Sequence, residues 1–74
     1  MNWHELNVVL TMRNERQVKA MLDEEVSVHK RPTYLVRIHQ RYSTLRAQRE
    51  RQELLEKISR AALTAQPAAP GGDA

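Results

Sequence analysis

The sequence predicts an all-α protein: an antiparallel helical hairpin with a short N-terminal helix and a long, overhanging third helix. Two capping-box pairs each precede an apolar segment, and no proline or glycine interrupts residues 33–66. In addition, the apolar stripe of this last stretch changes sides near its middle. We expect one domain over residues 1–65, with helices at about 3–12, 15–29 and 33–64. The proline- and glycine-rich residues 66–74 are expected to form a disordered tail.

The first helix is predicted from Asn2 and Glu5, which have the spacing of an N-cap residue and its capping-box partner. The following residues, up to Met12, are mostly apolar. Val8 and Val9 are β-branched and weaken the helix propensity, so a strand remains the alternative here. Only packing against other elements would hold this segment in place.

The second helix is predicted from Asn14 and Gln17, which repeat the capping-box spacing. Pro32 ends it, because the residue before a proline avoids the α region and proline cannot continue the hydrogen-bond ladder. The resulting tight reversal makes the second and third helices antiparallel neighbours. The side chains expected on the buried side of the second helix are Val18, Met21, Leu22, Val26 and either Val28 or His29.

The third helix is expected to span about 48 Å, against roughly 22 Å for the second, so it overhangs its hairpin partner from about Ala47 onward. Its apolar residues lie on one face before Arg49 and on nearly the opposite face after Glu53. The first stripe comprises Tyr34, Leu35, Ile38, Tyr42 and Leu45, and the second comprises Leu54, Leu55, Ile58, Ala61 and Ala62.

The second stripe needs a partner, and two are available. The first helix could fold back over part of the overhang, with Trp3, Leu6 and Val9 or Leu10 facing it, although it is only about 15 Å long. Alternatively, another molecule covers this face, because so short a chain has little else to supply. We favour an intermolecular contact and a homo-oligomer. The interface residues are then Val36, Ala47, Leu54, Leu55 and Ile58, with spacings typical of a helix seam.

Charge is unevenly distributed, although the formal net charge is only +3. Residues 26–49 contain no Asp or Glu but six Lys and Arg. This stretch could contact phosphates, or it could pair with the chain's own acids at 23–25 or with an acidic protein partner. The candidate partner- or phosphate-binding residues are Arg37, Arg41, Arg46 and Arg49. A helix-turn-helix is disfavoured, because the third helix is too long for a recognition helix.

We expect no enzymatic activity, metal, cofactor or small-molecule substrate. No two histidines have the spacing that brings both imidazoles to one helix face, and the chain has no cysteine. The three consecutive acids at 23–25 diverge around their helix, and no serine lies in a nucleophile elbow. No signal peptide or membrane span is predicted, and a cytoplasmic location is expected.

Residues 22–55, which include the run Tyr34-Leu-Val-Arg-Ile-His-Gln-Arg-Tyr and a preceding Lys-Arg-Pro, resemble small proteins of tailed bacteriophages whose role is unassigned. The resemblance implies a setting, the cytoplasm of a bacterial host, in which short chains bind a host or virion protein, or phage DNA. It brings no functional residues with it. The sequence therefore predicts a non-enzymatic, self-associating protein–protein interaction module, with DNA or RNA binding through the arginines as the alternative.

Overall fold

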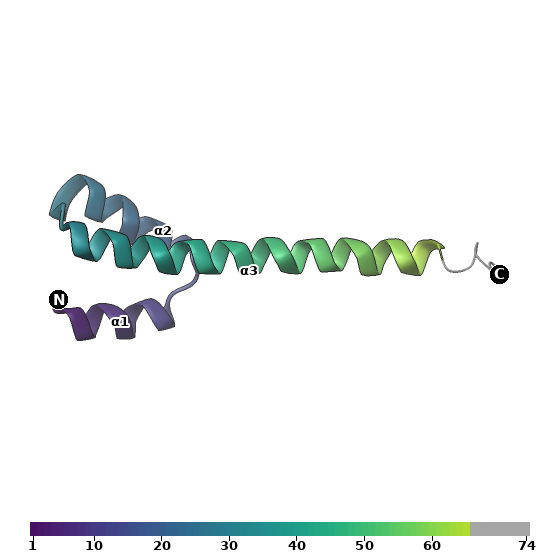
Figure 1. Ribbon diagram of the computed structural model, residues 1–74, viewed down its shortest axis with the longest axis horizontal. Coiled ribbons are helices and arrows are strands. Elements are labelled where there is room, and N and C mark those ends of the chain that lie inside the picture. Colours follow the sequence, from purple (N-terminus) through teal and green to yellow (C-terminus); the bar gives the residue numbers. More distant parts are fainter. Residues whose placement is uncertain (66–74) are drawn as a thin grey trace.

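The computed structural model describes residues 1–65, and within them it contains helices and no strand. The helices are α1 (Trp3–Met12), α2 (Glu15–Glu24), the π-helical turn η1 (Glu25–His29) and α3 (Pro32–Ala65) (Figure 1). The predicted all-α hairpin with a long third helix is confirmed, and the strand alternative for residues 3–12 is wrong. The predicted disordered tail, residues 66–74, lies outside the described residues.

Both predicted capping boxes are present. The Asn2 side chain accepts a hydrogen bond from the Glu5 N–H at 2.8 Å, and the Glu5 carboxylate accepts one from the Asn2 N–H at 3.1 Å. Asn14 and Gln17 make the same reciprocal pair at the start of α2, at 2.8 and 3.0 Å. Each box satisfies two backbone groups that have no partner inside the helix and so fixes where that helix begins.

A small core joins the three helices along the N-terminal half of α3. Leu6 and Leu10 of α1, Val18 of α2 and Ile38 of α3 are buried, and each is at most 2% exposed. The partly buried side chains that pack around them are Met21, Leu22, Tyr34, Tyr42 and Leu45. The first apolar stripe of α3 therefore faces the core, as predicted.

The helix α1 runs parallel to α3, whereas α2 runs antiparallel to it (Figure 1). Trp3 packs edge-on against Tyr34, and Asn7 and Leu10 bond to Arg37 and Arg41 further along α3. These contacts end before the overhang begins, so the expectation that α1 folds back over the overhang is wrong. The capping box at Asn14 directs α2 along α3, and the short connection at 13–14 leaves α1 beside the N-terminal half.

The last turn of the second helix is a π turn. The Lys30 N–H donates to the Glu25 carbonyl at 2.6 Å, an i to i+5 bond, and Lys30 adopts the left-handed conformation (φ 55°). The wider turn shifts the phase of the helix. The prediction that Val26 and Val28 are buried is wrong, since both are exposed. Glu25, seven residues after the buried Val18 and so on the same helix face, occupies the inner position. His29, the alternative to Val28 in that prediction, is exposed as well.

Glu25 and Arg31 close the turn between the second and third helices. The Glu25 carboxylate accepts three hydrogen bonds from Arg31: from the backbone N–H and Nη2 at 2.8 Å and from Nε at 2.9 Å. These bonds hold the pKa of Glu25 below its ordinary value, although burial opposes the shift. The Arg31 guanidinium also lies 4.1 Å from the centroid of the Tyr34 ring, so one cluster links the turn to α3.

Candidate interaction surfaces

The overhang of α3, residues 50–65, begins just beyond the last contact between α3 and α2. Arg49 Nε donates to Glu15 Oε1 at 2.7 Å, and Glu15 is the first residue of α2. Beyond this ion pair the described helix continues for about 24 Å without another helix beside it (Figure 1). The predicted overhang is present, and it starts three residues after Ala47, the predicted position.

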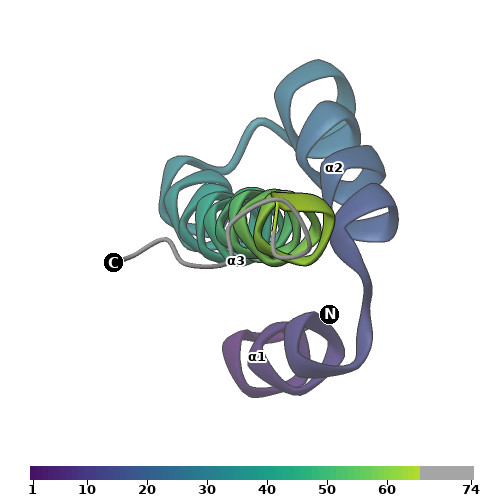
Figure 2. The same ribbon diagram turned by 90° about the vertical axis from the view of Figure 1, so that its right-hand side faces the viewer.

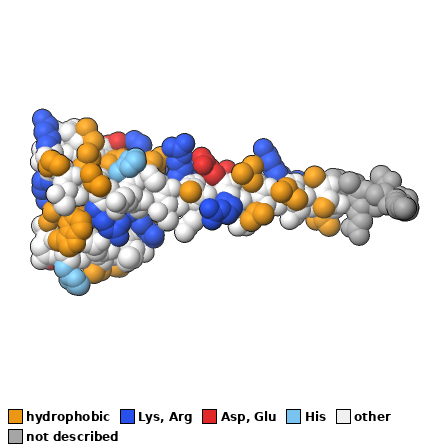
Figure 3. Space-filling model, viewed as in Figure 1, with side chains coloured by type: hydrophobic (Ala, Val, Ile, Leu, Met, Phe, Trp, Pro, Cys, Tyr) orange, Lys and Arg blue, Asp and Glu red, His pale blue; other side chains and the backbone are white. Residues whose placement is uncertain are grey.

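The second apolar stripe is exposed, as are the other two predicted interface residues, Val36 and Ala47, which lie N-terminal to it. These residues together are called the exposed stripe of α3 below. Leu54 is 59% exposed and Ile58 67% exposed on the overhang, and Val36 is 55% exposed on the N-terminal half. Leu55 and Ala47 are exposed as well. Figure 3 shows hydrophobic side chains scattered along the rod formed by α3. The alternative that α1 covers this stripe is therefore wrong, because α1 packs on another side of α3.

A shallow groove adjoins the N-terminal end of this stripe. It is lined by Trp3, Pro32, Thr33, Val36, Arg37 and Gln40. Trp3 is 47% exposed there, although its ring packs edge-on against Tyr34 at a centroid distance of 5.8 Å. Sequence reasoning missed this groove, because the pairing of α1 with the start of α3 depends on tertiary contacts that the helical periodicity does not reveal.

Arg37 and Arg41, two of the four candidate arginines, hold α1 in place. Arg37 Nε donates to Asn7 Oδ1 at 2.7 Å, and Arg41 Nε donates to the Leu10 carbonyl at 3.0 Å. Leu10 has one of the four final carbonyls of α1, which have no partner within that helix. No basic residue lies in the last turn of α1, and Arg41 supplies the missing charge from α3. The four-residue spacing of the two arginines places them on one face of α3, but only the packing of α1 identifies their acceptors.

Arg46 and Arg49, the other two candidates, pair with acids near the base of the overhang. Arg46 Nε donates to Glu50 at 3.2 Å, and Arg49 contacts Glu53 at 3.2 Å as well as Glu15. These hydrogen bonds raise the pKa of both guanidinium groups above the ordinary value. The structure thus divides the four arginines between two sites of contact, and it does not assemble them into one basic face.

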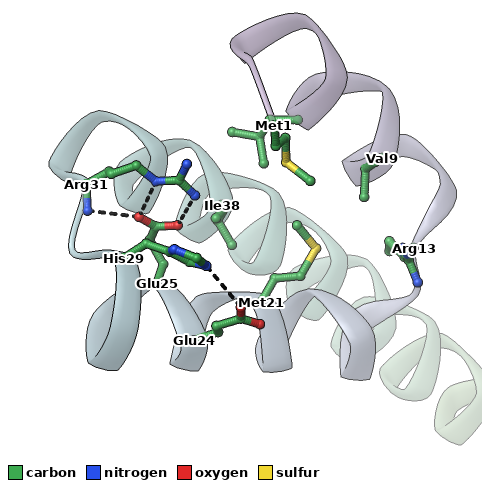
Figure 4. A pocket seen from close by; sticks show the side chains of 10 residues that line it. Met1, Val9, Arg13, Met21, Glu24, Glu25, His29, Arg31 and Ile38 are labelled. Atoms are coloured by element: carbon green, nitrogen blue, oxygen red, sulfur yellow. Dashed lines mark hydrogen bonds and ion pairs between the residues drawn. The ribbon is translucent and has the colours of Figure 1, made fainter.

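A cavity of about 160 Å³ lies between α1 and the second helix (Figure 4). Met1 and Val9 line it from one side and Met21 from the other, with Ile38 of α3 at its floor. Four polar side chains at its edge pair with each other: Glu25 with Arg31, and His29 Nε2 with Glu24 at 3.0 Å. Arg13 also lines the cavity. Its volume is below the roughly 300–1,000 Å³ typical of small-molecule sites.

Within residues 1–65, no group of three or more acidic or histidine side chains is arranged to hold a metal ion. No helix in this part of the chain is both long and apolar enough to cross a membrane. Comparison with protein-family models, with curated proteins and with solved structures finds no match. The exposed stripe of α3 is therefore the strongest functional candidate among the described residues.

Proposed function

We propose that this chain is a non-enzymatic protein–protein interaction module that self-associates through the exposed apolar stripe of α3. The observation that carries this proposal is the exposure of Leu54 and Ile58, at 59% and 67%, on a helical segment that no other described helix covers. A side chain of this size gains roughly 1.5–3 kcal/mol when it is fully buried. A contact that buries Leu54 and Ile58 on two copies would therefore gain the burial free energy of several such side chains.

The bonds that the candidate arginines make within the chain favour a protein partner over a nucleic acid. Arg37, Arg41 and Arg49 each have an acceptor within the chain, at 2.7–3.0 Å, so a phosphate would have to displace these bonds. Nucleic-acid binding stays the alternative, using the same arginines together with Arg46. The resemblance to tailed-phage proteins makes a host or virion protein the first heterologous partner to test.

The central experiment compares two variants of the same helix, one double and one single. Ile58 and Leu63 are equally exposed, at 67% and 68%, but they lie about 140° apart around α3. We expect Leu54→Asp with Ile58→Asp to abolish self-association in analytical ultracentrifugation, while circular dichroism shows that the helices remain. Leu63→Asp, the matched control, is expected to keep the association. A wild-type protein that stays monomeric at the highest attainable concentration would refute the proposal.

A salt series separates the nucleic-acid alternative. Binding through several phosphates makes affinity for an oligonucleotide fall steeply with salt, and Arg46→Ala would reduce that slope. Arg46 is the informative position, because its partner Glu50 is only four residues away and no contact with α1 or α2 depends on it. The alternative is rejected if neither duplex nor single-stranded oligonucleotides bind at low salt.

A further inference from the structure

The exposed stripe of α3 has an eleven-residue spacing. Val36, Ala47 and Ile58 are separated by eleven residues each, and all three are exposed. An eleven-residue repeat corresponds to 3.67 residues per turn, close to the 3.6 of an undistorted α-helix. The three residues therefore stay in line along a nearly straight helix. A second straight helix could follow this line over 22 residues, which is about 33 Å.

The elements of the same chain leave this line uncovered. Figure 2, viewed along α3, shows α1 on one side of the helix and α2 on another. Contacts with α1 come from Tyr34, Arg37 and Arg41, and Arg49 contacts α2. Ile38 belongs to the core that α3 forms with both of these helices. The line through Val36, Ala47 and Ile58 lies on the remaining side of α3.

The stripe has an apolar residue at the same distance on each side of Ala47. Eleven residues to either side lie the apolar Val36 and Ile58, and seven residues to either side lie Gln40 and Leu54. Four residues away are the short Ser43 and the long Arg51, whose side chain could extend past a serine to solvent. A two-fold axis at Ala47 would place each of these residues opposite its counterpart, and the alanine allows close approach there. In such an antiparallel homodimer, Val36 of each copy faces Ile58 of the other, so the two ends of the stripe cover each other.

Charge favours the antiparallel orientation over the parallel one. Residues 1–49 contain nine Lys and Arg against five Asp and Glu, a formal charge of +4, whereas residues 50–65 contain three of each and are neutral. A parallel pair would set two +4 regions side by side. An antiparallel pair sets each of them against a neutral overhang, and it brings Glu50 of each copy toward Arg46 of the other.

We propose that two copies pair their α3 helices antiparallel about Ala47, an inference that rests on the proposed self-association. The overhang of each copy then lies along the N-terminal half of α3 in the other. Ile58 packs against Val36 of the second copy, and Leu54 lies beside its Gln40. The shallow groove next to Trp3, which adjoins Val36, receives the end of the overhang. The second copy thus covers both halves of the stripe at once.

Cysteine cross-linking tests the register directly, because the chain has no cysteine of its own. Ala47→Cys is expected to form a disulfide-linked dimer under mild oxidation, since residues on the axis come within the roughly 4.4–6.8 Å Cα separation that a disulfide needs. Ala20→Cys, at an exposed alanine of α2, is the matched control and is expected to remain uncross-linked.

A mixture of Val36→Cys and Ile58→Cys separates the two orientations. The antiparallel register predicts that the mixed 36–58 disulfide dominates, whereas a parallel register predicts the two homodisulfides, and intact-mass spectrometry distinguishes these products. Dominant homodisulfides would overturn the antiparallel register. Sedimentation of the reduced variants shows whether they still associate: a dimer with the wrong disulfides refutes only the register, whereas a monomeric wild-type protein refutes self-association as well.

Discussion

The Glu25 carboxylate accepts hydrogen bonds from both the guanidinium and the backbone N–H of Arg31, and this pair joins the π turn to the start of α3. All three hydrogen bonds lie between 2.8 and 2.9 Å, and the Glu25 side chain is almost completely buried while that of Arg31 is 39% exposed. A buried carboxylate is tolerated because each of its oxygens has a charged donor. The stability of the hairpin should therefore depend on the ionisation of Glu25.

We expect an acid-induced loss of stability that Glu25 controls. Its pKa is lowered in the folded state, so its contribution to stability is complete above the unfolded value of about 4.3 and is lost as the pH falls through the folded value. Thermal unfolding should show little contribution from this group between pH 5 and 8 and a decline below about pH 4.

The control for this titration is Glu25→Gln, which removes the ionisable group at nearly constant volume. This variant is expected to be less stable than the wild type at pH 7 and to approach it in strong acid. Glu24→Gln, at the neighbouring exposed carboxylate, keeps the Glu25–Arg31 bonds and should retain the loss of stability below about pH 4. Equal acid sensitivity in the wild type and in Glu25→Gln would contradict the role given to Glu25.

The core is so small that one truncation should unfold much of the protein. Leu10 is 0% exposed, and Leu10→Ala is expected to lower the free energy of unfolding by about 2–5 kcal/mol. Val8, two residues away on the same helix, is 44% exposed, so Val8→Ala should cost far less. Denaturant titrations at one protein concentration provide the comparison. Similar losses in the two variants would show that α1 does not pack as described.

The sequence predicted the local structure of this protein better than its tertiary contacts. Asn2, Asn14 and Pro32 determine where helices begin and end, because capping and proline geometry act within a few residues. The π turn was missed, since its cause is the bond network between Glu25 and Arg31 across six residues. Val26 was expected on the buried side because it is apolar, although Glu25, seven residues after the buried Val18, is the residue that an ordinary helix places on that face.

For the candidate surfaces, the sequence predicted the exposed apolar stripe but not the contacts of the arginines. The exposed stripe followed from helix length, because α3 is much longer than α2 and the 34 residues of α3 leave an overhang whatever the packing. The roles of Arg37 and Arg41 could not be read from the sequence. Their acceptors, Asn7 and the Leu10 carbonyl, lie about 30 residues earlier in the chain, and only the parallel packing of α1 brings them together.

Arg41 should contribute to the stability of α1 rather than to ligand binding. Its bond to the Leu10 carbonyl spans two helices and is partly buried, and a hydrogen bond from a charged donor contributes about 1.5–3 kcal/mol. Arg41→Ala is therefore expected to destabilise the fold by roughly this amount. Arg46→Ala, which removes only an exposed i,i+4 pair, should cost about 0.5 kcal/mol or less. Chemical denaturation of the two variants tests this role. A loss of stability for Arg41→Ala no larger than that for Arg46→Ala would contradict it.

Hydrogen exchange along α3 should reveal association at single-residue resolution. In one isolated copy, residues 50–63 form a helical segment whose backbone hydrogen bonds have no helix packed over them, and helices of this length are marginal alone in water. Their amides should exchange rapidly in dilute solution and slowly in concentrated solution, because pairing protects them. The amides of the core residues Leu10 and Ile38 should change much less, since intramolecular packing already protects them. If dilution leaves exchange over residues 50–63 unaltered, the overhang is not the surface through which the copies associate.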